Sequence, residues 1–234
     1  MRNVAAVVLA AGGSSRLGQP KQLLTFRGET LIRRAVRAAA EAGCAPIVVV
    51  VGEARDAIEL SLGLRDSRIS SSLGQEGVAL PSAQLSAQPS AAPSASRSIV
   101  ATAAEGKLTL VENVEWRDGI GTSIRRGLER LPKDIDAAVL LTCDQPFLDA
   151  AIMRQLMVAQ EESGNPIVAS GYANTLGVPA LFHRSCFAAL LALPDATGAK
   201  AFIQSRQGDV ASIPFACGEI DIDSPEDLER LTAL

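Results

Sequence analysis

Histidine is nearly absent from this sequence of 234 residues, which contains only His183. A single histidine excludes any metal site built on two or more imidazoles, and a serine–histidine–aspartate triad would depend on that one side chain. Metal binding by this chain must therefore rely on carboxylate oxygens. His183 follows a predicted strand, where a surface or capping role is favoured over catalysis.

Paired cysteines, long apolar runs and an excess of basic residues are also missing. The chain has no C-x-x-C pair, so a zinc ribbon and a disulfide framework are excluded, and scattered thiols predict buried side chains in a reducing cytoplasm. No run approaches the roughly 18 apolar residues of a membrane helix. The formal net charge is −4 and the pI about 5.2, which argues against a global nucleic-acid-binding field. We expect a cytoplasmic protein with neither nucleic acid nor membrane as a partner. The cysteines are Cys44, Cys143, Cys186 and Cys217.

Short apolar runs alternate with helical patterns along most of the chain. Residues 4–10 and 47–51 are continuous apolar runs, typical of strands buried on both faces of a parallel sheet, and 135–142 is a third predicted buried strand, apolar from Ala137 to Leu141. Helical spacing between them predicts βαβ units. The expected fold class is α/β, a Rossmann-like, mostly parallel sheet with helices on both faces. Further strands are predicted at 108–111, 166–169, 178–182 and 209–213, and helices at 31–39, 54–62, 119–131, 149–162, 184–193, 198–206 and 225–234.

The composition changes abruptly at about residues 65–105. This segment is rich in Ser, Ala, Pro and Gln, and it has no charged residue between Glu76 and Arg97. Such a segment cannot bury enough apolar surface to offset its ordering entropy, which predicts a disordered or loosely held insertion. A surface loop without function is the favoured interpretation. The chain is therefore expected to be a single domain, residues 1–234, with one low-complexity insertion.

The loop after the first strand combines glycines with two cations. Glycines let backbone N–H groups approach an anion closely, and a following helix can add its positive end. Gln19 and Pro20 exclude a Walker loop, and no G-x-G-x-x-G dinucleotide fingerprint is present. Arg16 and Lys21 suit a triphosphate whose leaving pyrophosphate must be neutralised, although an ordinary turn with solvated charges is the alternative. The loop consists of Leu9, Ala10, Ala11, Gly12, Gly13, Ser14, Ser15, Arg16, Leu17, Gly18, Gln19, Pro20 and Lys21.

Three aspartates are candidate metal ligands. Asp144 follows the strand at 135–142, and ligands of open α/β sheets gather at the carboxyl ends of strands. Mg²⁺ prefers carboxylate oxygens, whereas a turn or capping aspartate is the alternative. Asp221 and Asp223 stand two residues apart on an extended segment, so they face the same way and could share a metal. Residues 224–227 instead resemble a helix start with Pro in the first turn.

Five segments together resemble the MobA-like NTP transferase family, and within it they are most similar to the molybdenum cofactor cytidylyltransferases. The segments are residues 9–21, the N-x-x-W-x-x-G-x-x-T-S-I pattern at 113–124, T-C-D-Q-P-F at 142–147, G-V-P-A-L-F at 177–182, and 221–227. The resemblance covers nearly all of the chain outside about 63–105. It implies a GT-A-like nucleotidyltransferase that transfers CMP from CTP to the phosphate of molybdenum cofactor (molybdopterin), with Mg²⁺ as cofactor and release of pyrophosphate. A molybdoenzyme would be a candidate recipient of the product.

The resemblance also implies roles for individual residues. Arg16, Lys21 and Asp144 would be catalytic, and Asp144 would hold Mg²⁺ together with Asp221 or Asp223. Trp116 is expected to pack in the core and not to stack on a base. The nucleotide-binding residues would be Leu9, Ala10, Ala11, Gly12, Gly13, Ser15, Arg16, Lys21, Ser123 and Asp144.

Two features limit the resemblance. The insertion is not part of the family pattern, and residues 195–200 (D-A-T-G-A-K) replace the usual G-D-x-G-A-R. Ala11 stands where related guanylyltransferases have glycine, and its methyl group would narrow the pocket floor in favour of a pyrimidine. Two alternatives stay open: a nucleotidyltransferase for a sugar phosphate or another phosphate acceptor, and a non-catalytic nucleotide- or cofactor-binding protein.

Overall fold

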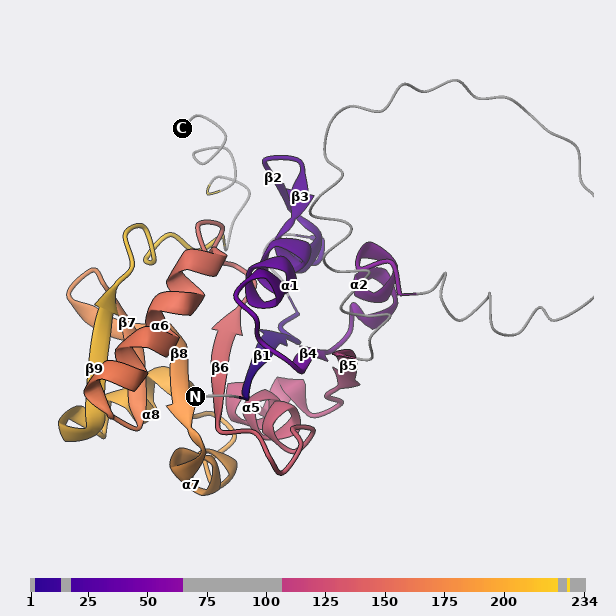
Figure 1. Cartoon of the computed structure of the whole chain (residues 1–234). Coiled ribbons are helices and arrows are strands. Elements are labelled where there is room, and N and C mark those ends of the chain that lie inside the picture. The colour runs from indigo at the N-terminus through magenta and orange to yellow at the C-terminus, as the bar shows by residue number, and fades with distance from the viewer. Residues whose placement is uncertain (1–2, 14–17, 65–106, 223–226, 228–234) are drawn as a thin grey trace, which may run out of the picture.

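A seven-stranded sheet in the order β5–β4–β1–β6–β8–β7–β9 forms the centre of the molecule (Figure 1). The computed structural model describes residues 3–13, 18–64, 107–222 and 227. Strands β5, β4, β1 and β6 run parallel, β8 is antiparallel to both of its neighbours, and β9 is parallel to β7. This confirms the predicted mostly parallel sheet. The strands are β1 (Val4–Ala10), β4 (Ile47–Val51), β5 (Leu108–Glu112), β6 (Ala137–Thr142), β7 (Ile167–Tyr172), β8 (Thr175–His183) and β9 (Val210–Pro214).

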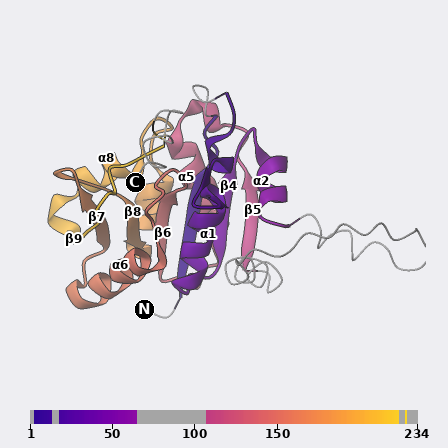
Figure 2. The same ribbon diagram turned by 90° about the horizontal axis from the view of Figure 1, so that it is seen from above.

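Helices cover both faces of this sheet, as predicted (Figure 2). Helices α1 (Leu31–Glu41), α2 (Arg55–Ser61) and α6 (Ala150–Ser163) pack on one face. Helices α5 (Ile120–Leu128), α7 (Phe187–Leu191) and α8 (Ala199–Gln204) pack on the other. Every residue of β1 and β4 is buried, because each strand has apolar neighbours above and below it. None of the helices in the described ranges is long and apolar enough to cross a bilayer.

Helix α6 shows how local sequence signals set the boundaries of an element. The Asp149 carboxylate accepts hydrogen bonds from the backbone N–H groups of Ala151 and Ile152, at 2.8 and 3.0 Å. Gly164 ends the helix in the left-handed conformation, with φ of 69°. Met153 is fully buried, which shows that the apolar side of the helix faces the sheet.

A small hairpin that the sequence did not predict follows the first loop. Strands β2 (Thr25–Phe26) and β3 (Glu29–Thr30) are joined by Arg27 and Gly28, with φ of 50° and 77°. Two consecutive positive φ angles are typical of a type I′ hairpin turn. Strands of two residues are too short for alternation to be visible, which is why the pattern missed them.

The chain after β8 does not form one continuous helix. The helix predicted at 184–193 is divided into a 3₁₀ turn and α7, and His183 Nδ1 accepts a hydrogen bond from Ser185 N at 3.3 Å, which confirms the predicted capping histidine. The insertion predicted at 65–105 lies entirely outside the described residues, and so does the helix predicted at 225–234 except for Asp227. The 3₁₀ turns are η1 (Lys21–Leu23), η2 (Trp116–Asp118), η3 (Arg184–Cys186) and η4 (Gln207–Asp209).

Candidate functional site

The loops after β1, β4 and β6 open at the same edge of the sheet. Leu9 pairs with Thr142 of β6, and Ala10 pairs with Val51 of β4. Because the strands are parallel, their following loops meet there. The loops after β1 and β6, together with Trp116 and the start of α5, enclose a cavity of about 310 Å³. It is lined by Leu9, Ala10, Ala11, Gly12, Lys21, Gln22, Trp116, Ile120, Ser123, Thr142, Cys143 and Asp144.

An ion pair between Lys21 and Asp144 lies in the wall of this cavity. Lys21 Nζ is 2.6 Å from Asp144 Oδ2, and the two side chains are 19% and 16% exposed. Partial burial strengthens a charge-assisted hydrogen bond relative to one on the surface. The pair therefore presents an ammonium group and a carboxylate to the same small space, where they can bind a phosphate and a cation respectively.

Gln22 fixes the conformation of the first loop beside this ion pair. Its Nε2 donates to the backbone carbonyl oxygens of Ala10 and Gly12, both at 2.8 Å. The side chain is only 1% exposed, and its Oε1 has no hydrogen-bond partner. Sequence reasoning missed this residue, since nothing in the local pattern distinguishes a buried glutamine from a surface one.

A buried polar network holds Ser123 in the cavity wall. Asn113 Nδ2 donates to Thr122 Oγ1 at 2.8 Å and to Ser123 Oγ at 2.9 Å. Asn113 Oδ1 in turn accepts from the backbone N–H of Glu115 at 3.1 Å. This arrangement positions the start of α5 against the cavity. Ser123 therefore lines the same cavity as the predicted nucleotide-binding loop, and its role stays a prediction.

The segment that carries Asp221 runs alongside Asp144. The N–H of Ile222 donates to the main-chain oxygen of Asp144 at 3.1 Å. Burial raises the pKa of the Tyr172 phenol, and the negative charges of Asp221 and Asp144 raise this pKa further. Both carboxylates therefore act on the same phenol, although Asp221 is exposed and does not line the 310 Å³ cavity.

The oxygen donors at this edge fit a divalent cation that the substrate helps to bind. The part of the chain that the structure describes contains no cluster of three His, Cys, Asp or Glu side chains suited to a metal. Mg²⁺ is often bound by only one or two carboxylates, with waters and substrate phosphates as the other ligands. Burial, and after it the charge of Asp144, raises the pKa of the Cys143 thiol to about 12, which favours the protonated thiol.

The structure brings most of the predicted site residues together. The cavity lining contains Leu9, Ala10, Ala11, Gly12, Lys21, Ser123 and Asp144. Gly13 lies in an adjoining hollow of about 260 Å³, which Gly18 and Glu53 also line. Ser15, Arg16 and Asp223 lie outside the described residues, so their roles stay predictions. Trp116 packs against the core as predicted, but it also lines the cavity.

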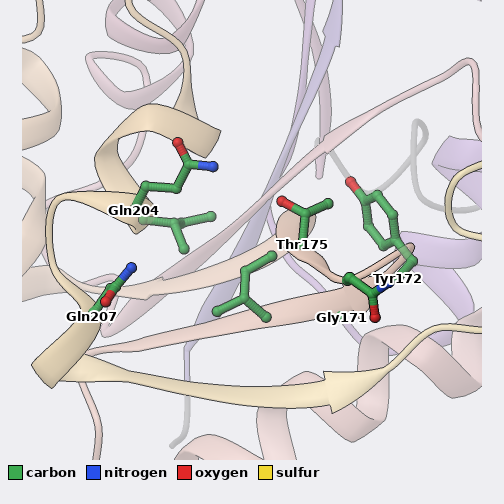
Figure 3. A pocket seen from close by; sticks show the side chains of 8 residues that line it. Gly171, Tyr172, Thr175, Gln204 and Gln207 are labelled. Atoms are coloured by element: carbon green, nitrogen blue, oxygen red, sulfur yellow. The ribbon is translucent and has the colours of Figure 1, made fainter.

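A second pocket, of about 540 Å³, lies between the β7–β8 hairpin and α8 (Figure 3). Its lining residues are neutral, so it offers a phosphate no charged partner. None of them belongs to the predicted site. We therefore place the candidate site at the edge formed by β1, β4 and β6. The second pocket is lined by Gly171, Tyr172, Asn174, Thr175, Leu176, Ile203, Gln204 and Gln207.

Three curated relatives share parts of this sequence. The bifunctional protein GlmU of Streptomyces avermitilis is 26% identical over 170 residues, which are 71% of this chain and 27% of that protein. A probable molybdenum cofactor guanylyltransferase of Opitutus terrae is 51% identical over 47 residues, 20% of this chain and 23% of that protein. Nicotine blue oxidoreductase of Paenarthrobacter nicotinovorans is 40% identical over 67 residues, 28% of this chain and 33% of that protein. The chain thus matches at most a third of the length of these relatives.

Solved structures and a family model extend the similarity to most of the chain. Rv0371c from Mycobacterium tuberculosis H37Rv has a TM-score of 0.70 and 25% identity, with 99% of this chain and 98% of that chain covered. A complex of Rv0371c with manganese has a TM-score of 0.62 and 23% identity, with 98% and 97% covered. The MobA-like NTP transferase domain matches residues 6–210, which confirms the predicted class of enzyme. The chain belongs to the MobA-like NTP transferase family.

Proposed function

We propose that this chain transfers a nucleotidyl group from a nucleoside triphosphate to a phosphate group on an acceptor, with release of pyrophosphate. The observation that carries this proposal is the Lys21–Asp144 pair, 2.6 Å apart in the wall of the cavity beside the glycine-containing loop. Group transfer between phosphates depends on positioning and charge neutralisation more than on covalent catalysis. A cation and a carboxylate at one strand edge supply both.

The reaction exchanges one phosphorus–oxygen bond for another. An oxygen of the acceptor phosphate bonds to the α-phosphorus, and the bond from that phosphorus to the oxygen bridging the α- and β-phosphates breaks. Pyrophosphate leaves with the electron pair. Lys21 would neutralise the charge that develops on it, and the N–H groups near Gly12 would orient the phosphates. Arg16 is proposed as a second cation from the sequence alone.

Mg²⁺ is the proposed cofactor. Asp144 would hold it, with Asp221 or Asp223 as the second carboxylate. When bound, a divalent cation withdraws charge from the phosphate oxygens and stabilises the transition state. Support comes from the all-oxygen donor set and from the manganese complex of Rv0371c, a protein of the same fold.

The proposed substrates are CTP and molybdopterin. Ala11 lines the cavity, and its methyl group would favour a pyrimidine, whereas the Opitutus terrae relative is named as a guanylyltransferase. A pocket difference of one methyl is worth about 1–3 kcal/mol, so we expect at least about a tenfold preference for CTP over GTP in kcat/KM. On the sequence alone, we further propose that the chain is a single domain, that it is cytoplasmic, and that a molybdoenzyme receives the product.

A second candidate differs only in the acceptor. The match to the molybdenum cofactor protein covers 20% of this chain, whereas the match to GlmU covers 71%. Neither match identifies the acceptor. The alternative to molybdopterin is therefore a sugar phosphate or another phosphorylated compound. The chemistry at the α-phosphorus would be unchanged.

The test is a pyrophosphate-release assay with each of the four nucleoside triphosphates, with and without molybdopterin. We expect release with CTP and molybdopterin in the presence of Mg²⁺ and its loss in excess EDTA. Release with a sugar phosphate but not with molybdopterin would select the second candidate. If the folded protein releases no pyrophosphate from any nucleotide with either acceptor class, nucleotidyl transfer is rejected.

A further inference from the structure

Trp116 is the chain's single tryptophan, and its indole lies across the carboxyl ends of β1 and β4. The five-membered ring lies against Gly52, where an added Cβ would be 2.9 Å from Cδ1 and 3.1 Å from Cγ. The six-membered ring lies against Gly13, where an added Cβ would be 2.9 Å from Cζ3. Both glycines therefore lack a side chain where the indole needs the space.

The surroundings leave the indole little freedom to move. Gly13 and Gly52 contact it with backbone, and backbone yields less readily than a flexible side chain. The guanidinium carbon of Arg117 lies 4.4 Å from the ring centroid, as in a cation–π contact. Arg117 Nη2 is also 3.3 Å from Glu53 Oε2, just beyond the end of β4. Backbone after the ends of two strands therefore confines the ring, and the exposed Arg117 adds a contact at its face.

The indole separates two hollows. On one side it lines the 310 Å³ cavity that also contains Ala11, Lys21 and Asp144. It also lines a polar hollow of about 610 Å³, together with Gly52 and Glu53 at the end of β4. Removing the ring would join the two hollows and widen the space available beside the phosphate-binding groups.

We propose that Trp116 determines which bases the site prefers: it limits the width of the cavity, so that a pyrimidine nucleoside triphosphate is accepted in preference to a purine one. The inference rests on the proposed nucleotidyl transfer. A fixed wall discriminates by size, and purines have two fused rings where pyrimidines have one. Ala11 contributes only a methyl group to the cavity lining, whereas Trp116 contributes an indole ring.

Substitution of Trp116 tests the proposal through a ratio of rates. Pyrophosphate release would be measured with CTP and with GTP for wild type, Trp116→Ala and Trp116→Phe. In Trp116→Ala we expect the CTP-to-GTP ratio of kcat/KM to fall at least about tenfold, mainly through a gain with GTP. Trp116→Phe keeps an aromatic wall and should hold the ratio within about threefold of wild type. The matched control is Leu60→Ala, a 65% exposed residue of α2, which should leave the ratio unchanged.

If Trp116 only packed against its neighbours, the Trp116→Ala variant would give a different result. The rates with CTP and with GTP would fall together, and their ratio would stay unchanged. An unchanged ratio in a folded Trp116→Ala variant therefore overturns the proposal and leaves nucleotidyl transfer standing. A wild-type enzyme that uses GTP as efficiently as CTP also overturns the proposal about Trp116.

Fluorescence of the wild-type chain gives a second, independent readout, because all tryptophan emission comes from position 116. Without acceptor, CTP should change this emission in a saturable manner, and GTP at the same concentration should not. This measurement needs no variant to fold. Equal responses to both nucleotides overturn the inference. A protein that neither responds to any nucleotide nor releases pyrophosphate overturns the proposed function as well.

Discussion

Two loops of the site share one arrangement, a charged residue followed by a buried glutamine, but the two glutamines bond to residues at different separations in the sequence. In the loop after β1, the charged Lys21 is followed by the buried Gln22, and in the loop after β6, the charged Asp144 is followed by the buried Gln145. Each glutamine donates through Nε2 to two backbone carbonyl oxygens, and each leaves a buried Oε1 without a hydrogen-bond partner. Because all four acceptors are carbonyl oxygens, the orientation of both amides is determined.

The two glutamines differ in how far along the chain they reach. Gln22 bonds to Ala10 and Gly12, no more than 12 positions away. Gln145 bonds to Val178 and Gly218, which are 33 and 73 positions away. The first loop is therefore stabilised locally, whereas the second depends on the antiparallel part of the sheet. In the proposed function, the charged residues therefore carry the chemistry and the glutamines position the loops.

Replacement of the charged residue after β6 should have the largest effect. Asp144→Asn keeps the shape of the side chain and removes its charge. We expect turnover to fall at least about 100-fold, because Lys21 and the proposed Mg²⁺ both lose their carboxylate partner. Steady-state pyrophosphate release measures this effect, with circular dichroism as the control for folding. Wild-type rates in a folded variant would remove Asp144 from the mechanism.

The charged residue after β1 should give the next largest effect. Lys21→Ala removes the ammonium group proposed to neutralise pyrophosphate, so we expect kcat/KM to fall by about tenfold or more. The loss of rate should outweigh the loss of stability, since the side chain meets Asp144 and the cavity and not the apolar core, although Asp144 loses its ion-pair partner. Kinetics and thermal unfolding of the same preparation decide the point. Normal kinetics with a lowered melting temperature would make Lys21 a structural residue.

Replacement of the glutamines should separate positioning from chemistry. Gln145→Leu and Gln22→Leu both keep the approximate volume and remove the donors, which lowers the free energy of unfolding by about 1–3 kcal/mol in each case. The larger loss is expected for Gln145, because its bonds join distant segments. Urea unfolding of the two variants measures the difference. Equal losses, or a larger loss for Gln22, would contradict the distinction between local and long-range stabilisation.

The titration of Tyr172 should give the smallest effect. Burial, Asp221 and Asp144 raise its pKa above the ordinary value of about 10. The protonated phenol therefore contributes stability that is fully present below pH about 10 and is lost as the pH rises through the raised pKa. Ultraviolet absorbance follows this step cleanly, because the chain has one tyrosine. Asp221→Asn should lower the titration midpoint, while an unchanged midpoint would mean that Asp221 lies too far away to share a cation with Asp144.

The buried strands and the limits of α6 followed from local patterns. Residues 4–10 and 47–51 are apolar throughout, and the structure buries them completely. Asp149 and Gly164 mark the ends of α6 through contacts with their own neighbours in sequence. By contrast, the β2–β3 hairpin and the broken helix at 184–193 escaped prediction. Their elements are too short for periodicity to outweigh turn geometry.

What the sequence determined by itself was the inventory: buried strands, a loop with two cations and an aspartate at a strand end. The tertiary structure decided which of these meet. Lys21 and Asp144 are 123 positions apart, and they touch only because β1 pairs with β6 in parallel and both strands end at one edge. The same pairing with β4 brings Gly52 under the indole of Trp116. Contacts of this range depend on the order of the strands, and that order follows from the packing of the whole sheet, which no local pattern encodes.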